Sequence, residues 1–149
     1  LAAAAGDAAP MIWQLAYTGL RLSELMGLKA DNVVNGVIVL QSNTKSGKPR
    51  VIPMHPEIAS YPIPVTVTRR QFRDLFEAAR AAIGRPELHA HDLRHTFVSW
   101  LIQGGASLTA VRDLAGHAHL GVTSRYAHLQ DEHLKKAMKT IGVKKKARK

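Results

Sequence analysis

Apolar residues recur at helical spacing in the first part of the chain. They predict a helix over residues 8–18, and the glycine that follows marks its end. The segment RLSELMGLK, residues 21–29, predicts a second, short helix that packs through Leu22, Leu25 and Met26. The chain is therefore expected to begin with two helices.

The apolar pattern then changes from helical spacing to short β-branched runs. In VVNGVIVL, residues 33–40, the pair Asn35-Gly36 suits a type I′ turn between the two strands of a hairpin. A second turn, KSGK (45–48), leads into RVIPM (50–54), so we expect three short antiparallel strands. The next segment, residues 55–67, contains three prolines and predicts a loop.

Helical spacing returns after this loop. Thr68 and Gln71 form a capping box for a helix over about residues 69–83, which ends before Gly84 and Pro86. We expect the inward face of this helix to consist of five apolar residues: Phe72, Leu75, Phe76, Ala79 and Ile83.

The segment HDLRHTFVSWLIQGG, residues 91–105, predicts a longer helix that its two final glycines close. Its apolar residues lie on nearly every side of the helix, so we expect this helix to be buried. These residues are Leu93, Phe97, Trp100 and Leu101 on one side and Val98 and Ile102 on the other.

Two further helices complete the pattern. Ser107 caps a helix over LTAVRDLA, residues 108–115, which ends at Gly116, and a last helix is predicted over residues 131–141. The expected fold class is therefore α+β, mainly helical, with one small three-stranded antiparallel sheet.

The composition restricts the classes of protein that are possible. A chain of 149 residues that is 46% hydrophobic forms one domain with a proper core, and no run of 18 apolar residues predicts a membrane span. The start, LAAAAGDAAP, is not a signal peptide, and it begins with Leu1, so we expect a domain of a longer protein. The absence of cysteine excludes disulfides and cysteine nucleophiles and fits a cytoplasmic protein.

The net charge of +10 is unevenly distributed. Residues 135–149 hold eight of the 21 basic residues and no acidic residue, so residues 1–134 carry a charge of only +2. We expect a balanced domain over residues 1–134, followed by a basic tail. Such a tail attracts polyanions without reading their sequence, although a solvated terminus explains the charge equally well.

The strongest candidate for chemistry is HDLRH. His91 and Arg94 share a helix face, and His95 lies one turn from His91. A metal site could also use His117 and His119, but the positive charge of Arg94 argues against one. An anion site suits His91 and Arg94 better, because a guanidinium donates two parallel hydrogen bonds to a phosphate.

Four segments in the expected elements make the chain similar to a known family. From about residue 8 to residue 134 it resembles the catalytic domain of the tyrosine recombinase, or phage integrase, family. The matching segments are TGLRLSEL (18–25), TKSGKPRVIP (44–53), HDLRHTF (91–97) and LAGHAHLGVTSRY (114–126). The resemblance implies the fold of DNA breaking-rejoining enzymes, and a core-binding domain that would precede residue 1.

The resemblance also implies the roles of individual residues. Tyr126 would be the nucleophile that forms a 3′-phosphotyrosyl link to DNA, and Glu24 would steady the first arginine. The other implied catalytic residues are Arg21, Lys45, His91, Arg94 and His117. Neither a metal nor a nucleotide cofactor is implied.

Rivals exist for two of these roles. Lys48 competes with Lys45, which is favoured because the family's lysine precedes the turn, and Tyr17 and Tyr61 compete with Tyr126. Further contacts to DNA are expected from six basic residues: Lys48, Arg50, His95, Lys144, Lys145 and Lys146.

The expected partner is double-stranded DNA, in the cytoplasm of a bacterium or a phage-infected host. The resemblance implies a monomer in the free state and a tetramer on synapsed DNA. Two other functions stay open: a DNA-binding domain of the same fold without activity, and a type IB topoisomerase, which relaxes DNA without a partner site.

Overall fold

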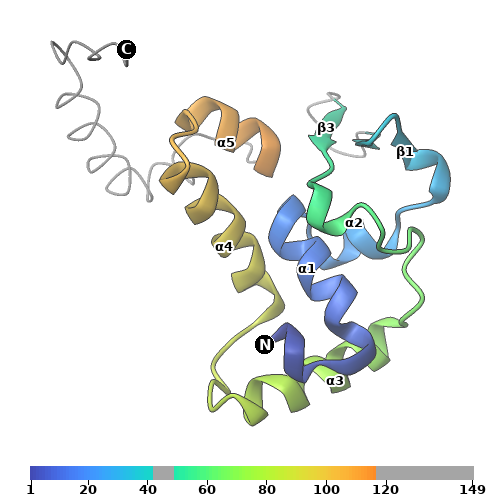
Figure 1. The fold of residues 1–149 in the computed structure, drawn as a ribbon, viewed down its shortest axis with the longest axis vertical. Coiled ribbons are helices and arrows are strands. Elements are labelled where there is room, and N and C mark those ends of the chain that lie inside the picture. The colour runs from blue at the N-terminus through green and yellow to red at the C-terminus, as the bar shows by residue number, and fades with distance from the viewer. Residues whose placement is uncertain (42–48, 117–149) are drawn as a thin grey trace, which may run out of the picture.

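The computed structural model describes residues 1–41 and 49–116 of the chain. Helices make up most of these ranges (Figure 1). The α-helices are α1 (Ala9–Thr18), α2 (Leu22–Met26), α3 (Arg69–Ala82), α4 (Ala90–Gln103) and α5 (Leu108–Ala115). The strands are β1 (Val33–Val34), β2 (Val37–Leu40) and β3 (Arg50–Pro53). Short 3-10 turns cover Ala2–Ala4, Gly6–Ala8, Ala30–Asn32 and Pro56–Ile58.

The three strands form one antiparallel sheet in the order β1-β2-β3. Val34 faces Val37 across a two-residue turn in which Asn35 and Gly36 have φ angles of +50° and +74°. A type I′ turn needs positive φ at both positions, so the predicted hairpin is confirmed. On β2 and β3 the register partners Ile38 and Ile52 are both buried, which fixes the face of the sheet that meets the core.

The main core surrounds α1, which lies between α4 and α2 in Figure 1, with α3 below it in that view. Leu15 of α1, Leu25 of α2 and Phe72 of α3 are almost completely buried in one apolar cluster that also includes the sheet's isoleucines. Burying a side chain of this size stabilises the fold by roughly 1.5–3 kcal/mol. The core therefore fixes the positions of α1 and α2, whose junction carries the first candidate site residue.

Helix α3 begins as its sequence predicts. The backbone N–H of Gln71 donates to the Thr68 hydroxyl at 3.3 Å, and the backbone N–H of Thr68 donates to Gln71 Oε1 at 3.0 Å. The expected inward face is confirmed for Phe72, Phe76 and Ala79, which are buried, and for Leu75, which packs partly buried against them. The prediction for Ile83 is wrong: it is 40% exposed, because the helix ends one residue earlier.

Helix α4 has one buried side and one open side. Phe97, Val98 and Ile102 form a second apolar cluster with Val111 and Ala115 of α5. Trp100 is 43% exposed, so the expectation of a helix buried all round is wrong. The physical reason is that α1 and α5 pack against only part of its surface.

The expected fold class is confirmed, because the described residues are mainly helical with one small antiparallel sheet. Within residues 1–41 and 49–116, no helix combines the length and the apolar character needed to span a membrane.

Candidate active site

Arg21 lies at the corner between α1 and α2. Its backbone N–H donates to Glu24 Oε2 at 2.7 Å, and its Nη1 donates to Glu24 Oε1 at 3.0 Å. The carboxylate lies in the first turn of α2, where the helix dipole favours a negative charge. The Arg21 side chain stays 49% exposed, so its guanidinium is anchored at one edge and remains accessible to a ligand.

Arg94 is buried in α4, and its Nη1 donates to the backbone carbonyl of Gly19 at 2.7 Å. Gly19 ends α1 with a φ of +63°, and a Cβ there would lie 2.3 Å from a ring carbon of Phe97. A glycine is therefore required by both the backbone conformation and the close approach of α4. This contact brings Arg94 to the corner that carries Arg21.

His91 and His95 extend this group along α4. Both are exposed, and their rings meet edge to face with centroids 4.9 Å apart. Partial desolvation lowers the pKa of His91 below its ordinary 6.5, and the charge of His95 adds to this effect. Arg94 and Arg21 lower the pKa of His91 further, whereas Asp92 opposes them.

Arg21 at the α1–α2 corner therefore lies close enough to the start of α4 to add to the lowering of the His91 pKa. The lowered pKa favours the neutral imidazole, which accepts a proton. The arrangement combines donors suited to an anion with a group that can act as a base.

Glu24 joins two arginines. Its carboxylate accepts from Arg21, and its Oε2 also accepts from Arg50 Nη2 at 2.8 Å. Burial alone would raise the pKa of Glu24, but the hydrogen bond from the Arg21 backbone and the charge and hydrogen bond of Arg50 outweigh it. The pKa of Glu24 therefore lies below its ordinary value, and the carboxylate is ionised at neutral pH.

Arg50 is one of the basic residues that the sequence suggested as DNA contacts. Its side chain is only 12% exposed and is turned inward to Glu24 and to the carbonyl of Ala115. Local sequence contains no signal for this orientation, because the two partners lie on α2 and α5, far away along the chain.

The remaining candidates lie outside the described residues. This applies to the catalytic candidates Lys45, His117 and Tyr126, to the basic residues Lys48, Lys144, Lys145 and Lys146, and to the predicted helix over 131–141. The structure thus brings together Arg21, Glu24, His91, Arg94 and His95, which is the part of the predicted site within the described ranges.

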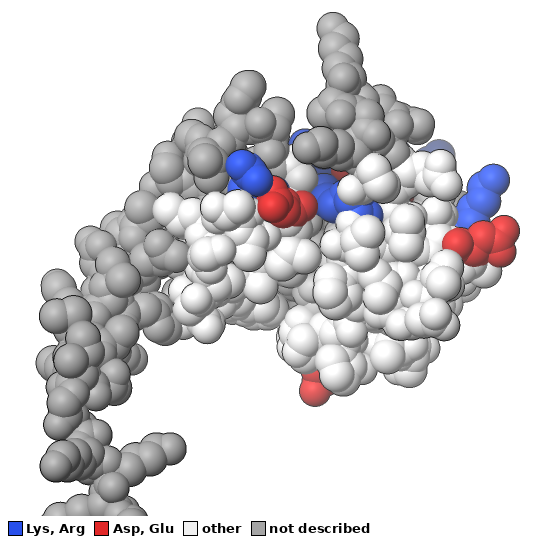
Figure 2. Space-filling model, turned by 90° about the horizontal axis from the view of Figure 1, so that it is seen from above, with Lys and Arg blue, Asp and Glu red and all other residues white. Residues whose placement is uncertain are grey.

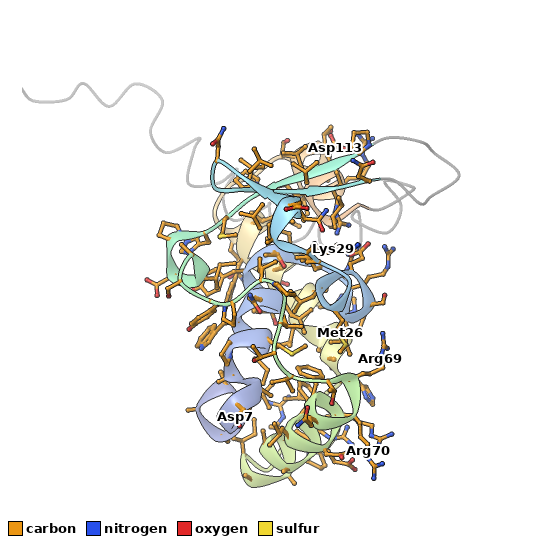
Figure 3. The ribbon with its side chains drawn as sticks, turned by 90° about the vertical axis from the view of Figure 1, so that its right-hand side faces the viewer. Asp7, Met26, Lys29, Arg69, Arg70 and Asp113 are labelled. Carbon is orange, nitrogen blue, oxygen red and sulfur yellow. The ribbon has the colours of Figure 1, made fainter. Side chains whose placement is uncertain are left out.

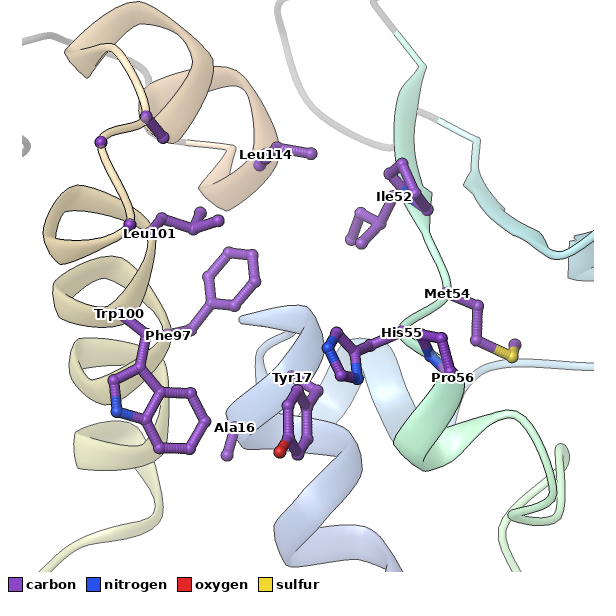
Figure 4. A pocket seen from close by; sticks show the side chains of 14 residues that line it. Ala16, Tyr17, Ile52, Met54, His55, Pro56, Phe97, Trp100, Leu101 and Leu114 are labelled. Carbon is purple, nitrogen blue, oxygen red and sulfur yellow. The ribbon is translucent and has the colours of Figure 1, made fainter. Parts of the chain in front are cut away.

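Tyr17, a rival nucleophile, belongs to an aromatic cluster. Its ring stacks on His55 at a centroid distance of 4.4 Å and approaches Trp100 at 5.4 Å. These three side chains line an apolar groove of about 690 Å³ between α1, β3, α4 and α5 (Figure 4). The ring contacts give Tyr17 a packing role. Tyr61, the other rival, is half-buried in the loop that follows Pro56–Ile58.

Sequence reasoning missed one group of basic side chains. Arg69, Arg70 and Arg73 are exposed at the N-terminal end of α3, and Figure 3 shows the first two on the outer surface of that helix. Their signal was the run RRQFR, residues 69–73, directly after the helix cap Thr68. The nearly balanced charge of residues 1–134 as a whole concealed it. On the face drawn in Figure 2, by contrast, Lys and Arg side chains lie beside Asp and Glu side chains.

The described part of the chain contains no group of three or more His, Cys, Asp or Glu side chains that is arranged to hold a metal ion. His119, which the metal interpretation would need together with His117, lies outside it.

Comparison with known proteins identifies the family. The sequence profile of the phage integrase family matches residues 64–133. Tyrosine recombinase XerD of Lacticaseibacillus casei is 32% identical over 149 aligned residues, which cover 83% of this chain and 51% of that protein. The integrase of Haemophilus phage HP1 is 33% identical over 82% of this chain and 37% of its own length. The chain thus spans about half the length, or less, of these curated relatives.

Solved structures of recombinases and integrases have the same fold as this chain. The catalytic domain of bacteriophage HP1 integrase superposes with a TM-score of 0.64 and 29% identity, covering 95% of this chain and 86% of that one. XerA recombinase has the same fold, with a TM-score of 0.68 at 24% identity over 97% of this chain and 60% of its own. The Tn1549 transposon integrase, solved in complex with circular intermediate DNA, gives a TM-score of 0.65 at 22% identity over 85% of this chain and 59% of that one. The chain therefore belongs to the tyrosine recombinase, or phage integrase, family.

Proposed function

We propose that this chain is the catalytic part of a site-specific DNA recombinase or integrase, which cleaves and rejoins strands through a 3′-phosphotyrosyl intermediate. The observation that carries the proposal is the hydrogen bond from Arg94 to the Gly19 carbonyl, which brings Arg94 and His91 of α4 to the corner that carries Arg21. Two guanidinium groups beside a neutral imidazole suit a phosphodiester, because its charge grows during substitution at phosphorus.

In the proposed reaction Tyr126 Oη attacks the scissile phosphorus. One P–O bond to tyrosine forms, and the bond from phosphorus to the 5′-oxygen breaks. A tyrosine hydroxyl has an ordinary pKa of about 10, so its proton must be taken up, and His91 is the assigned acceptor. Lys45 returns a proton to the leaving 5′-oxygen.

Arg21, Arg94 and His117 are assigned to the non-bridging oxygens of the phosphate. Removing one such donor typically costs on the order of 10²–10³-fold in rate. Glu24 holds Arg21 in place through the two hydrogen bonds described above. The phosphotyrosyl ester keeps the energy of the broken bond, so a 5′-hydroxyl from a second duplex reverses the step, and the chemistry needs neither a metal nor a nucleotide.

Double-stranded DNA is the proposed partner, and the DNA complex of the Tn1549 integrase supports it. We assign the catalytic unit to residues 1–134 and the basic tail to residues 135–149. The active assembly is proposed to be a tetramer on two synapsed duplexes that forms from free monomers, in the cytoplasm where bacterial or phage DNA is accessible.

A covalent trap tests the proposal. The chain is incubated with a pool of duplexes that carry a nick beside randomised sequence, so that the cut end diffuses away and the adduct accumulates. A protein–DNA adduct that survives denaturation is expected for the unaltered chain and for the control Tyr17→Phe, and none for Tyr126→Phe.

The other outcomes decide against the proposal. An adduct that persists in Tyr126→Phe would remove the assigned nucleophile, and tight DNA binding without any adduct would indicate a non-catalytic DNA-binding domain. Relaxation of supercoiled plasmid without joining of two duplexes would instead indicate a topoisomerase.

A further inference from the structure

Arg50 connects three elements that are distant in sequence. It is the first residue of β3, its Nη2 donates to Glu24 Oε2 of α2 at 2.8 Å, and its Nη1 donates to the Ala115 carbonyl of α5 at 2.7 Å. Only 12% of the side chain is exposed. A guanidinium this deeply desolvated requires its partners, and the ionised Glu24 supplies the compensating charge.

The end of α5 is shaped to receive this side chain. Gly116 follows the helix with a φ of +68°, and a Cβ there would lie 2.2 Å from Arg50 Nη1. Any side chain at position 116 would therefore displace the guanidinium. The cation also lies where the helix dipole of α5 favours positive charge, next to the last carbonyl groups.

Glu24 is the shared element of two contacts. Its Oε2 accepts from both Arg50 Nη2 and the Arg21 backbone N–H, while Oε1 accepts from Arg21 Nη1. A shift of Arg50 therefore moves the carboxylate that holds Arg21. The same shift breaks the hydrogen bond from Arg50 to the Ala115 carbonyl. Ala115 lies two positions before His117 in the sequence.

We propose that Arg50 is a positioning residue for the cleavage reaction, which fixes the end of α5 relative to Glu24 and hence to Arg21. This inference rests on the function proposed above. It replaces the role that sequence reasoning expected, which was a direct contact from Arg50 to the DNA backbone. The two roles predict different responses to the same substitutions.

The experiment compares Arg50→Lys and Arg50→Gln with the unaltered chain, well below the unfolding temperature of each variant. The rate of Tyr126 adduct formation is measured at saturating DNA, using sequences enriched from the randomised pool. Both variants are expected to lose on the order of 10²-fold in this rate, because a displaced group in the site costs about that much. Lysine keeps the charge, but its single nitrogen lacks the fork that spans Glu24 and Ala115.

DNA affinity separates positioning from contact. If Arg50 only positions the site, both variants keep a dissociation constant for DNA, and a salt dependence, close to those of the unaltered chain. With a phosphate contact, affinity falls and the slope of log K against log salt weakens by about 0.9 in Arg50→Gln. The latter result, or an Arg50→Lys chain with full rate, would overturn the inference. Arg112→Gln is the matched control, because Arg112 pairs with Asp113 on the surface of α5.

Gly116→Ala provides a second route to the same contact. It is expected to slow adduct formation strongly in the unaltered chain and much less in Arg50→Gln, where the opposing guanidinium is gone. Equal slowing in both backgrounds would mean that Gly116 does not serve Arg50, and would contradict the inference.

A titration of Glu24 by NMR is independent of catalysis. Arg50→Gln is expected to raise the pKa of Glu24, because it removes one charge and one hydrogen bond from the ionised carboxylate. If the unaltered chain forms no adduct, the proposed function fails, yet this titration still tests the contact. An unchanged pKa of Glu24 would overturn the Arg50 inference alone.

Discussion

Arg94 of α4 donates to the carbonyl of Gly19, 75 positions earlier in the sequence, and this hydrogen bond helps to bring α4 to the corner that carries Arg21. Both Arg94 and Arg21 disfavour the protonated form of His91, because a positive charge repels the proton. Desolvation is nevertheless the main cause of the lowered pKa of His91, and the charge of His95 comes next.

The titration of His91 tests the effect of the Arg21 charge on its pKa. In the DNA-free chain its midpoint is expected below 6.5, and Arg21→Gln should move it upward because one repelling charge is removed. NMR chemical shifts of the ring follow the titration directly. In Arg112→Gln the midpoint should stay unchanged, and an equal upward shift there would contradict a specific effect of Arg21.

The same pKa has a consequence for stability. Because the folded pKa of His91 lies below the unfolded value, protonation favours the unfolded chain. This residue's contribution is therefore complete well above pH 6.5 and is lost as the pH falls from 6.5 through the lower pKa of the folded chain. Replacing His91 by Gln should reduce the decline of unfolding free energy over that pH range.

At the scale of elements, the sequence predicts what depends on neighbouring residues. The Thr68 and Gln71 box, the Asn35-Gly36 turn and the pair Ser107 and Gly116 each satisfy backbone groups within a few positions, so each is readable as a local pattern. Family resemblance added Arg21, whose proximity to His91 and Arg94 no local pattern contains.

Contacts between distant elements were not predictable in this way. Arg50 and Ala115 are 65 positions apart in the sequence. The local sequence around Arg50, a basic residue after a basic turn, does not indicate whether its side chain faces solvent or Glu24. The predicted burial of Trp100 was wrong for a related reason. Helical spacing shows which sides of α4 are apolar, but it does not show which of these sides a neighbouring element covers.

The start of α3 supports a prediction about charge. Arg69 and Arg70 occupy a first helical turn without any acidic residue, where the helix dipole disfavours cations. Replacing both by Gln should raise the free energy of unfolding by roughly 0.3–1 kcal/mol per charge at low ionic strength, measured by chemical denaturation.

The same double variant should bind duplex DNA more weakly, with a salt slope that weakens by about 0.9 for each phosphate that the two arginines neutralise. Fluorescence anisotropy at several salt concentrations measures both quantities. Arg85→Gln, which breaks a surface pair with Glu87 beyond the other end of α3, is the control. An unchanged slope in the double variant would exclude this end of α3 from the DNA interface.

At the scale of the whole molecule, charge and chemistry are separated along the chain. Residues 1–134 carry the four matching motifs with a net charge of only +2, whereas residues 135–149 carry +8 and none of those motifs. Phosphate contacts of a basic segment add affinity without sequence information, while the geometry of the site decides cleavage. The two functions should therefore be separable by deletion.

Removal of residues 144–149 tests this separation, since it deletes five of the basic residues. The salt slope of DNA binding is expected to fall by as much as about 4 to 5 if all five contact phosphates, and affinity falls with it. The rate of adduct formation at saturating DNA should not change. A chain of full length with serine at those five positions distinguishes charge from length, and it should behave like the deletion. If both variants keep the slope of the unaltered chain, the tail is solvated, and the phosphate contacts belong to the body, where Arg69 and Arg70 are the first candidates.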